Sequence, residues 1–272
     1  MKAIHYKFLG FFLVFFGFGL SSIAQESKPR YLTVTTLHRN TSNPDLTKED
    51  WLKVEKEYFD KVVMKNPLVL KHNILTHFFT EDNTEILLVQ LYENWEAIGK
   101  AWDKENELIK AAWPDEKARD AFFEKRGAFY ADGHSDEIYT VLPYRKELSK
   151  LPDKQLVYYV RKTATIEPKD GTQKEFDSLF KEVQDNLAAK NDILKAYYTY
   201  AHAWGSKGSE FVEVFVYDSL GDIEKGWNKD DELAKAYWKD EAKMKEFDKK
   251  LNKYFSPIHG DYLYRNEVGL QK

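Results

Sequence analysis

Histidine is the side chain in this sequence best suited to acid–base or metal chemistry near neutral pH. Four of the histidines form two pairs, each separated by the same 125 residues: His77 with His202, and His134 with His259. An aspartate follows two residues after each member of the second pair, at Asp136 and Asp261. Residues two apart in a strand point to the same face, so each His-x-Asp motif could present an imidazole and a carboxylate together.

Two interpretations of these histidines stay open. In the first, the metal-binding candidates are His134, Asp136, His259 and Asp261, because imidazole and carboxylate ligands suit zinc, iron or copper. A closed barrel would then bring His77 toward His259 and Asp261, and His202 toward His134 and Asp136. In the second, His134 and His259 hydrogen-bond the turns before the following strands, and His77 and His202 are half-buried with satisfied nitrogens. The second is favoured, because histidine is commonly intermediate in burial without being a ligand.

Polar-tipped aromatic side chains and one carboxylate lie on strands expected in the second half of the chain. With the mid-strand histidines they form the ligand-binding candidates: His77, Tyr200, His202, Trp204, Glu213 and Tyr217. A small-molecule pocket needs such convergent polar groups in an apolar or aromatic lining. The alternative is that these polar side chains lie near a sheet edge without binding a ligand. The pattern supports the pocket and this alternative equally. If a site exists, we expect it to include His77 or His202, with Tyr200 and Trp204 beside it.

The 125-residue offset extends far beyond the histidines. The segment WDKENELIKAAWPDE at 102–116 meets WNKDDELAKAYWKDE at 227–241, and Tyr139 meets Tyr264. Such self-similarity predicts a tandem duplication, with one copy at 27–148, the other at 154–272 and a short polar junction between them. The repeated tryptophans, Trp102, Trp113, Trp227 and Trp238, are spaced by three helical turns within each copy, and we expect them to face the core.

Each copy is expected to run β-α-β-β-α-α-β. In the first copy β-rich segments lie at 31–37, 68–79, 84–92 and 136–143, and helical periodicity follows Thr47 and again covers 94–113 and 114–130. The second copy has strands at 156–166, 193–204, 209–217 and 261–267, and helices after Thr172, at 219–238 and at 240–255. Thr47-x-x-Asp50 and Thr172-x-x-Glu175 have capping-box spacing, and Pro114 favours the first turn of its helix.

This element order resembles a ferredoxin-like unit, and specifically the dimeric α/β-barrel superfamily with a helical insertion before the last strand. The resemblance implies an α+β protein in which two tandem ferredoxin-like domains pack as an internal dimeric α/β barrel. Members of that superfamily include monooxygenases, haem enzymes and small-molecule-binding proteins. The fold alone therefore does not choose the function.

The beginning of the chain has the features of a cleavable signal peptide over residues 1–24. Lys2 and Lys7 precede an apolar run from Phe8 to Leu20, and small residues lead to Ala24. The run is short for a membrane span, and no lipid-accepting cysteine follows it. We therefore expect a periplasmic or extracellular protein with no membrane attachment after cleavage, monomeric because the fused copies replace a dimer.

Composition narrows the possible partners. The chain has 43% hydrophobic and 15% aromatic residues and no cysteine, so it must be stabilised by a core rather than by disulfides. Its net charge is −4, or −6 without Lys2 and Lys7, which argues against nucleic-acid binding. No glycine-rich phosphate loop, Gly-x-Ser-x-Gly elbow or His-Glu-x-x-His helix occurs, so no cofactor is identified.

Three functions are compatible with these residues. The first is binding of a small, partly apolar molecule in a pocket on the sheet faces. The second is a monooxygenase-like or metal-dependent oxidoreductase that uses the paired histidines and the strand tyrosines. The third is a structural or interaction module without a site.

Overall fold

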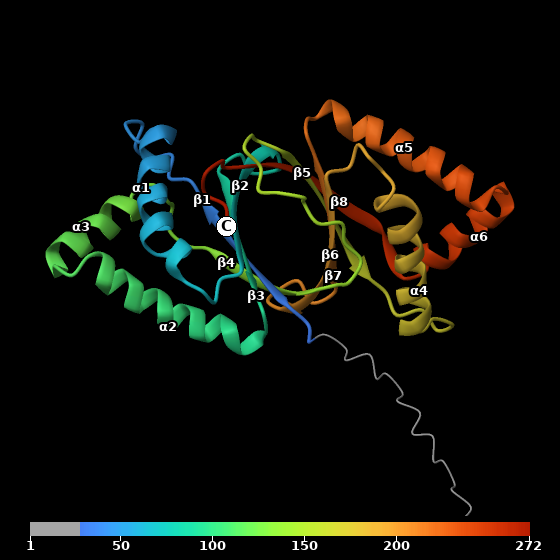
Figure 1. Ribbon diagram of the computed structural model, residues 1–272, viewed down its shortest axis with the longest axis horizontal. Coiled ribbons are helices and arrows are strands. Elements are labelled where there is room, and N and C mark those ends of the chain that lie inside the picture. Colours follow the sequence, from blue (N-terminus) through green and yellow to red (C-terminus); the bar gives the residue numbers. More distant parts are fainter. Residues whose placement is uncertain (1–27) are drawn as a thin grey trace, which may run out of the picture.

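The computed structural model describes residues 28–272, which form one closed barrel of eight antiparallel strands with six α-helices outside it (Figure 1). The strands are β1 (Tyr31–His38), β2 (Lys71–Phe79), β3 (Glu85–Tyr92), β4 (Ser135–Val141), β5 (Val157–Thr165), β6 (Ala196–Trp204), β7 (Glu210–Tyr217) and β8 (Phe255–Asn266). The α-helices are α1 (Lys48–Lys61), α2 (Trp95–Ala112), α3 (Glu116–Gly127), α4 (Gln173–Val183), α5 (Gly221–Trp238) and α6 (Glu241–Asn252). A 3₁₀ turn, η1 (Val63–Lys65), follows α1, and a π-helical turn, η2 (Gln184–Ala188), follows α4.

Both predicted capping boxes start their helices. The Thr47 side chain accepts a hydrogen bond from the Asp50 backbone N–H at 3.1 Å, and Thr172 does the same for Glu175 at 3.1 Å. These bonds satisfy N–H groups that have no partner inside the helix. The sequence prediction of both helix starts is therefore confirmed.

The strands close in the order β1-β3-β2-β8-β5-β7-β6-β4. The first four strands of the chain and the last four each form a connected sheet, and two seams join these sheets. At one seam β2 pairs with β8, with His77 opposite Tyr264; at the other β4 pairs with β6, with Tyr139 opposite His202. The expected pairing of a second strand with the other half's last strand is confirmed.

Apolar side chains fill both faces of the barrel wall. Leu87 and Leu91 of β3 face a cluster inside the barrel, whereas Ile86, next to Leu87, packs under the helices with Trp51 and Val54 of α1. Figure 1 shows α1, α2 and α3 on one side of the barrel and α4, α5 and α6 on the other. Since successive side chains alternate between faces, each strand contributes to two separate cores.

The prediction that all four repeated tryptophans face the core is wrong for two of them. Trp102 on α2 is 72% exposed and Trp227 on α5 is 52% exposed, whereas Trp113 is 7% exposed and stacks on Phe122 at 4.1 Å. The small residues Ala97 and Ala101 form the buried face of α2. Trp113 lies beyond the end of α2 with φ −131°, so the helical period that links it to Trp102 does not set its direction.

Two other boundaries differ from the sequence prediction. β8 begins at Phe255 rather than at 261, so His259 lies within the strand and not in the turn before it. Pro114 stands outside α3, because Asp115 is the N-cap and accepts from the Ala118 N–H at 2.8 Å. A proline before the cap needs no N–H partner, which makes this position equally suitable.

Within residues 28–272, no helix has the length and apolar character needed to cross a membrane. The predicted signal peptide, residues 1–24, lies outside the described residues.

Candidate functional site

A cavity of about 460 Å³ lies inside the barrel. Its middle is lined by aliphatic side chains that point inward from six strands: Leu32, Val34, Leu75, Leu87, Val89, Leu91, Val141, Val160, Val212 and Val214. The volume falls in the range of sites that bind small molecules, and an apolar lining of this kind favours an apolar ligand.

Three tyrosines bring hydroxyl groups into this apolar lining: Tyr158, Tyr198 and Tyr200. Burial raises the pKa of Tyr158 to about 12 and raises those of Tyr198 and Tyr200 further, so all three are neutral near pH 7. The Tyr198 hydroxyl accepts from the Leu148 N–H at 3.2 Å. The Tyr200 hydroxyl has no hydrogen-bond partner among residues 28–272, which leaves it free to bind a polar atom of a ligand.

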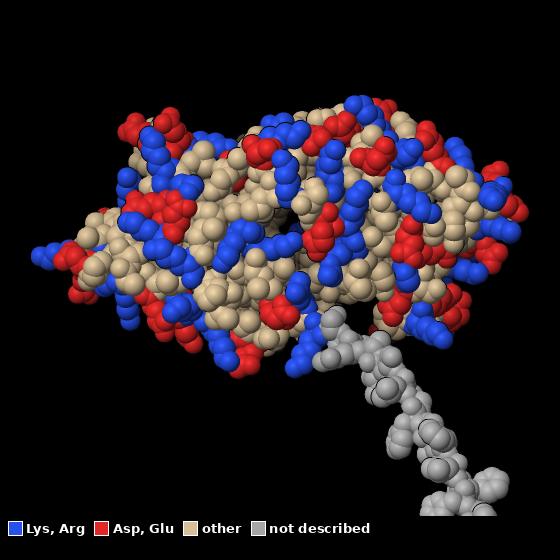
Figure 2. Space-filling view, in the orientation of Figure 1, with Lys and Arg blue, Asp and Glu red and all other residues tan. Residues whose placement is uncertain are grey.

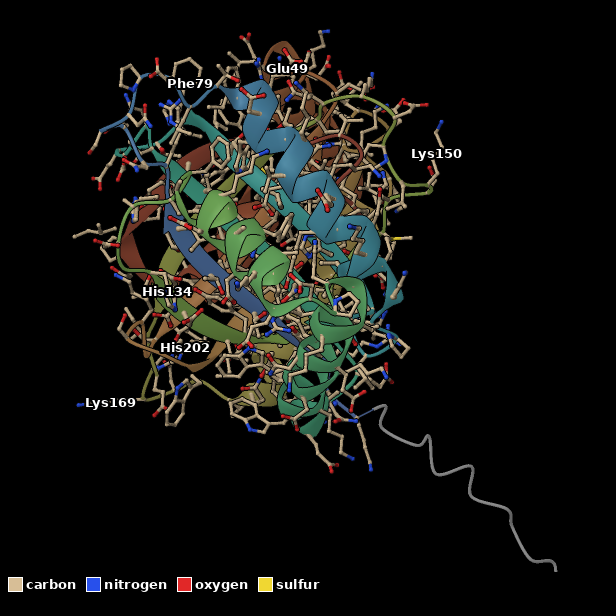
Figure 3. The ribbon with its side chains drawn as sticks, turned by 90° about the vertical axis from the view of Figure 1, so that its left-hand side faces the viewer. Glu49, Phe79, His134, Lys150, Lys169 and His202 are labelled. Atoms are coloured by element: carbon tan, nitrogen blue, oxygen red, sulfur yellow. The ribbon has the colours of Figure 1, made fainter. Side chains whose placement is uncertain are left out.

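The junction between the two halves of the chain lies at one end of the cavity. The lining here comes from the end of the first half and from the junction, through Arg145, Glu147, Leu148, Lys150, Leu151 and Pro152, beside Arg30, Lys71 and Lys272. Figure 2 shows a hollow near the middle of this face with Lys and Arg side chains around it. In Figure 3, Lys150 lies at this end and His202 lies toward the opposite end. This open, cation-rich end is called the mouth below.

The opposite end, called the floor, carries two tyrosine–glutamate pairs that connect the halves. Tyr139 on β4 donates to Glu210 on β7 at 2.6 Å, and Tyr264 on β8 donates to Glu85 on β3 at 2.8 Å. Both tyrosines are buried, with 4% and 1% exposure. Lys162 also reaches the floor and lies 3.9 Å from Glu210.

His202 lies near the floor and has a partner that the sequence did not suggest. Its Nε2 is 3.1 Å from Glu137, and both side chains are largely buried. Burial acts to raise the pKa of Glu137, but hydrogen bonds from Ser206 and from the Lys207 backbone, with the nearby His202, hold it below the ordinary value. Gly205 is required here, because it has φ +126° and an added Cβ would lie 2.0 Å from the Glu137 carboxylate. The geometry therefore gives His202 a satisfied structural environment.

His77 lines a second cavity of about 370 Å³ between the α1 N-terminus and the ends of β2 and β3. Its Nδ1 lies 2.8 Å from the Thr80 hydroxyl. Trp51 and Phe129 form apolar walls of this cavity, while Arg39 and Lys48 bring positive charge. His77 is thus next to a concavity, but one separate from the barrel interior that Tyr200 lines.

The other ligand-binding candidates do not join Tyr200. Trp204 is 66% exposed and lines neither cavity. Glu213 and Tyr217 lie on the outer face of β7, because their neighbours Val212, Val214 and Val216 face the interior. Tyr197 donates to Glu213 at 2.6 Å, and burial raises the pKa of this carboxyl.

The Tyr217 ring has a packing role. It is fully buried and lies over Gly226 of α5, where an added Cβ would come within 2.5 Å of the ring. Glu213 and Tyr217 therefore lie on the outer face of the barrel wall, whereas Tyr200 lies on the inner face. The three residues do not share one site.

The four metal-binding candidates form two separate pairs rather than one site. His134 lies 3.1 Å from Asp136, and His259 lies 3.1 Å from Asp261. Asp261 also accepts hydrogen bonds from Tyr159 at 2.7 Å and from Arg161 at 3.1 Å. Over residues 28–272 no group of three or more His, Cys, Asp or Glu residues could hold a metal ion. The expected approach of His77 to His259 does not occur, since the register puts Tyr264 beside His77.

Sequence reasoning missed the groups that define the two ends of the cavity. A signal for the floor was present, because Glu85 and Glu210 keep the same 125-residue offset as Tyr139 and Tyr264. The mouth had no such signal, since its charges come from separate parts of the chain: Arg30, Lys71, Lys272 and the polar segment from Arg145 to Lys150.

No known protein family matches the sequence, and no curated protein matches it. Solved structures do share the fold. A presumed monooxygenase from Fusobacterium nucleatum subsp. nucleatum has a TM-score of 0.53 at 12% identity, over 89% of this chain and 93% of its own. An anthrone oxidase-like protein has a TM-score of 0.51 at 11% identity, over 92% of this chain and 94% of its own. A chlorite dismutase variant from Candidatus Nitrospira defluvii has a TM-score of 0.50 at 11% identity, over 89% and 92%.

These neighbours are dimeric α/β-barrel proteins of the monooxygenase and chlorite dismutase type, in agreement with the resemblance stated from element order. At such low identity the likeness concerns the fold alone.

Proposed function

We propose that this protein binds a small, largely apolar molecule inside the barrel. The observation that carries the proposal is the cavity of about 460 Å³ with an aliphatic middle and the free Tyr200 hydroxyl. A barrel that served only as a scaffold would gain stability by filling this space, because empty apolar volume forfeits packing contacts.

Saturable binding of the neutral fluorophore N-phenyl-1-naphthylamine tests the proposal. We expect its fluorescence to rise with one-to-one stoichiometry, and the rise to disappear in a Val214→Trp variant, whose indole occupies the cavity. Val268→Trp is the matched control, because Val268 is 43% exposed and lies outside both cavities. Equal binding by both variants, or no saturable binding by the unaltered protein, would contradict the proposal.

A second candidate is an oxygenase that oxidises the molecule bound in this cavity with O₂. Its support is the fold shared with proteins named as a presumed monooxygenase and an anthrone oxidase-like protein, together with the tyrosine hydroxyls in an apolar cavity. Ligand-dependent O₂ consumption distinguishes it from simple binding. An oxygen electrode that records no uptake with a bound ligand would leave binding as the function.

We also propose that residues 27–148 and 154–272 are tandem copies of one ferredoxin-like domain, packed as an internal pseudo-dimer. The element order occurs twice, and the floor pairs Tyr139–Glu210 and Tyr264–Glu85 exchange equivalent residues between the copies. Such an arrangement supports a monomeric protein. Measurement of the molar mass in solution tests this oligomeric state.

The export of the protein is a further proposal, which rests on residues 1–24. N-terminal sequencing of the mature chain should begin after Ala24. Retention of Lys2 and Lys7 would overturn it.

A further inference from the structure

Cationic side chains are concentrated at the mouth of the cavity. Five of its lining residues there are cationic, namely Arg30, Lys71, Arg145, Lys150 and Lys272, against a single lining carboxylate, Glu147. Three of the five have partners outside the lining: Arg30 pairs with Glu93, Lys150 pairs with Asp153, and Lys272 donates to the backbone carbonyls of Val63 and Asn66. At the floor the lining carries Lys162, whereas Glu85 and Glu210 do not line the cavity and accept hydrogen bonds from Tyr264 and Tyr139. The excess positive charge of the mouth therefore rests on Arg145 and Lys71, and it favours an anionic group beside them.

The central ion pairs of the mouth leave positive charge in excess. Lys71 Nζ lies 2.8 Å from one oxygen of Glu147, and Arg145 Nε lies 3.0 Å from the other. Two cations thus share one carboxylate, which satisfies only part of their hydrogen-bonding capacity. A guanidinium presents five donors in a planar fork and an ammonium presents three, so each retains donors for a ligand.

The space between the two ends is suited to an apolar chain or ring. Its walls are aliphatic apart from the tyrosine hydroxyls and the neutral amides of Asn73 and Gln271, which hydrogen-bond each other, and burial keeps the hydroxyls neutral. A charged group in this middle section would lose its hydration without gaining an ion-pair partner. The cavity therefore favours a ligand that carries charge at one end only, with an uncharged remainder in the middle section.

We propose that the ligand is an amphipathic monocarboxylate, which enters with its apolar part first and leaves its carboxylate beside Arg145 and Lys71. This inference rests on the proposed binding function and adds the chemical class and the orientation of the ligand. It also assigns the segment that leads into the junction, through Arg145 and Glu147, a direct role in selecting the ligand.

Three ligands with the same eight-carbon chain test the head group. Isothermal titration with octanoate, 1-octanol and octylammonium should give the tightest binding for octanoate and the weakest for octylammonium. Raising the salt concentration should weaken octanoate binding and leave octanol binding unchanged, because screening acts on the charged contact alone.

Two variants at the mouth should shift octanoate binding in opposite directions. Arg145→Gln should weaken it about tenfold, which corresponds to about 1.4 kcal/mol. Glu147→Gln should strengthen it, since the competing carboxylate is removed. Both shifts should be several times smaller for octanol, which brings no charge to the mouth. Lys169→Gln is the control for net charge, because Lys169 is exposed and lies toward the opposite end in Figure 3.

The outcomes separate the two levels of the proposal. Equal affinities for octanoate and octanol, or shifts of the same sign in both variants, would overturn the assignment of a carboxylate while binding in the barrel stands. Absence of saturable binding for all three ligands, with no binding of the neutral fluorophore, would overturn the barrel site itself and the ligand class with it.

Discussion

A buried ion pair between α1 and α3 tests how much a buried charge without its partner destabilises this protein. Arg126 donates through Nε and Nη2 to the two carboxylate oxygens of Glu55 at 2.8 and 3.0 Å. Glu55 is 3% exposed, and the guanidinium lies 3.9 Å over the ring of Tyr58. The positions 125 residues later hold Phe180 and Leu251, which pack in apolar clusters. The second half of the chain therefore needs no ion pair at this place.

Removal of one partner should cost far more than removal of both. Arg126→Met leaves the Glu55 carboxylate buried without its cation, and the expected loss of unfolding free energy is about 3–5 kcal/mol. The double variant Glu55→Leu with Arg126→Met replaces both charges by apolar groups of similar volume. We expect its stability to lie within about 1 kcal/mol of the unaltered protein, or above it.

Urea denaturation monitored by tryptophan fluorescence measures these free energies, and a melting curve should show the single variant lowered by roughly 6–20 °C. Lys245→Met is the matched control, because Lys245 pairs with Glu241 at the surface, where both side chains are more than two-thirds exposed. Its cost should stay below about 1 kcal/mol. A double variant as unstable as Arg126→Met, or an Arg126→Met variant as stable as the control, would refute the reasoning.

Three further predictions concern the seams, the pH dependence and the junction. Tyr139→Phe or Tyr264→Phe should each lower the unfolding free energy by about 2 kcal/mol, measured by urea denaturation, since each removes a hydrogen bond from a buried tyrosine to a partly buried carboxylate; a cost below about 0.5 kcal/mol would contradict this. Burial lowers the pKa of His72 from 6.5 to about 3, so the unfolded chain binds a proton below pH 6.5 that the folded chain does not. Stability should therefore fall by up to about 1.4 kcal/mol per pH unit from pH 6.5 toward 3, and His72→Gln should show a shallower slope in the same titration; an unchanged slope would count against it. Proteolytic cutting between Leu148 and Pro152 should give two fragments that co-elute in size-exclusion chromatography, because each alone exposes the apolar inner face of its strands; separate, folded, monomeric fragments would disprove the packing argument.

The amino-acid sequence alone determined the elements and their order. Period-two and period-3.6 patterns and capping residues such as Thr47 and Thr172 act over a few residues, so they identify strands and helix starts without knowledge of the fold. The element order then indicated the barrel and its seams, which the pairing of β2 with β8 and of β4 with β6 confirms. Exact ends were less predictable, as the early start of β8 at Phe255 shows.

Only the tertiary structure decided which face of each strand looks into the barrel. In β7 both faces are covered, one by the opposite wall and one by helices, so both read as apolar in the sequence. Alternation separates Val214 from Glu213 but cannot say which of them is inside. That choice places Tyr200 in the cavity, and Glu213 and Tyr217 under the helices.

Barrel closure also decided the two ends of the cavity. Tyr139 and Glu210 are 71 residues apart in the chain and meet only because β4 and β7 lie two strands apart across the β6 seam. Arg145 and Glu147 belong to a polar segment whose local pattern predicts no more than a linker. They become the mouth of a site because closing the barrel places the junction over its open end.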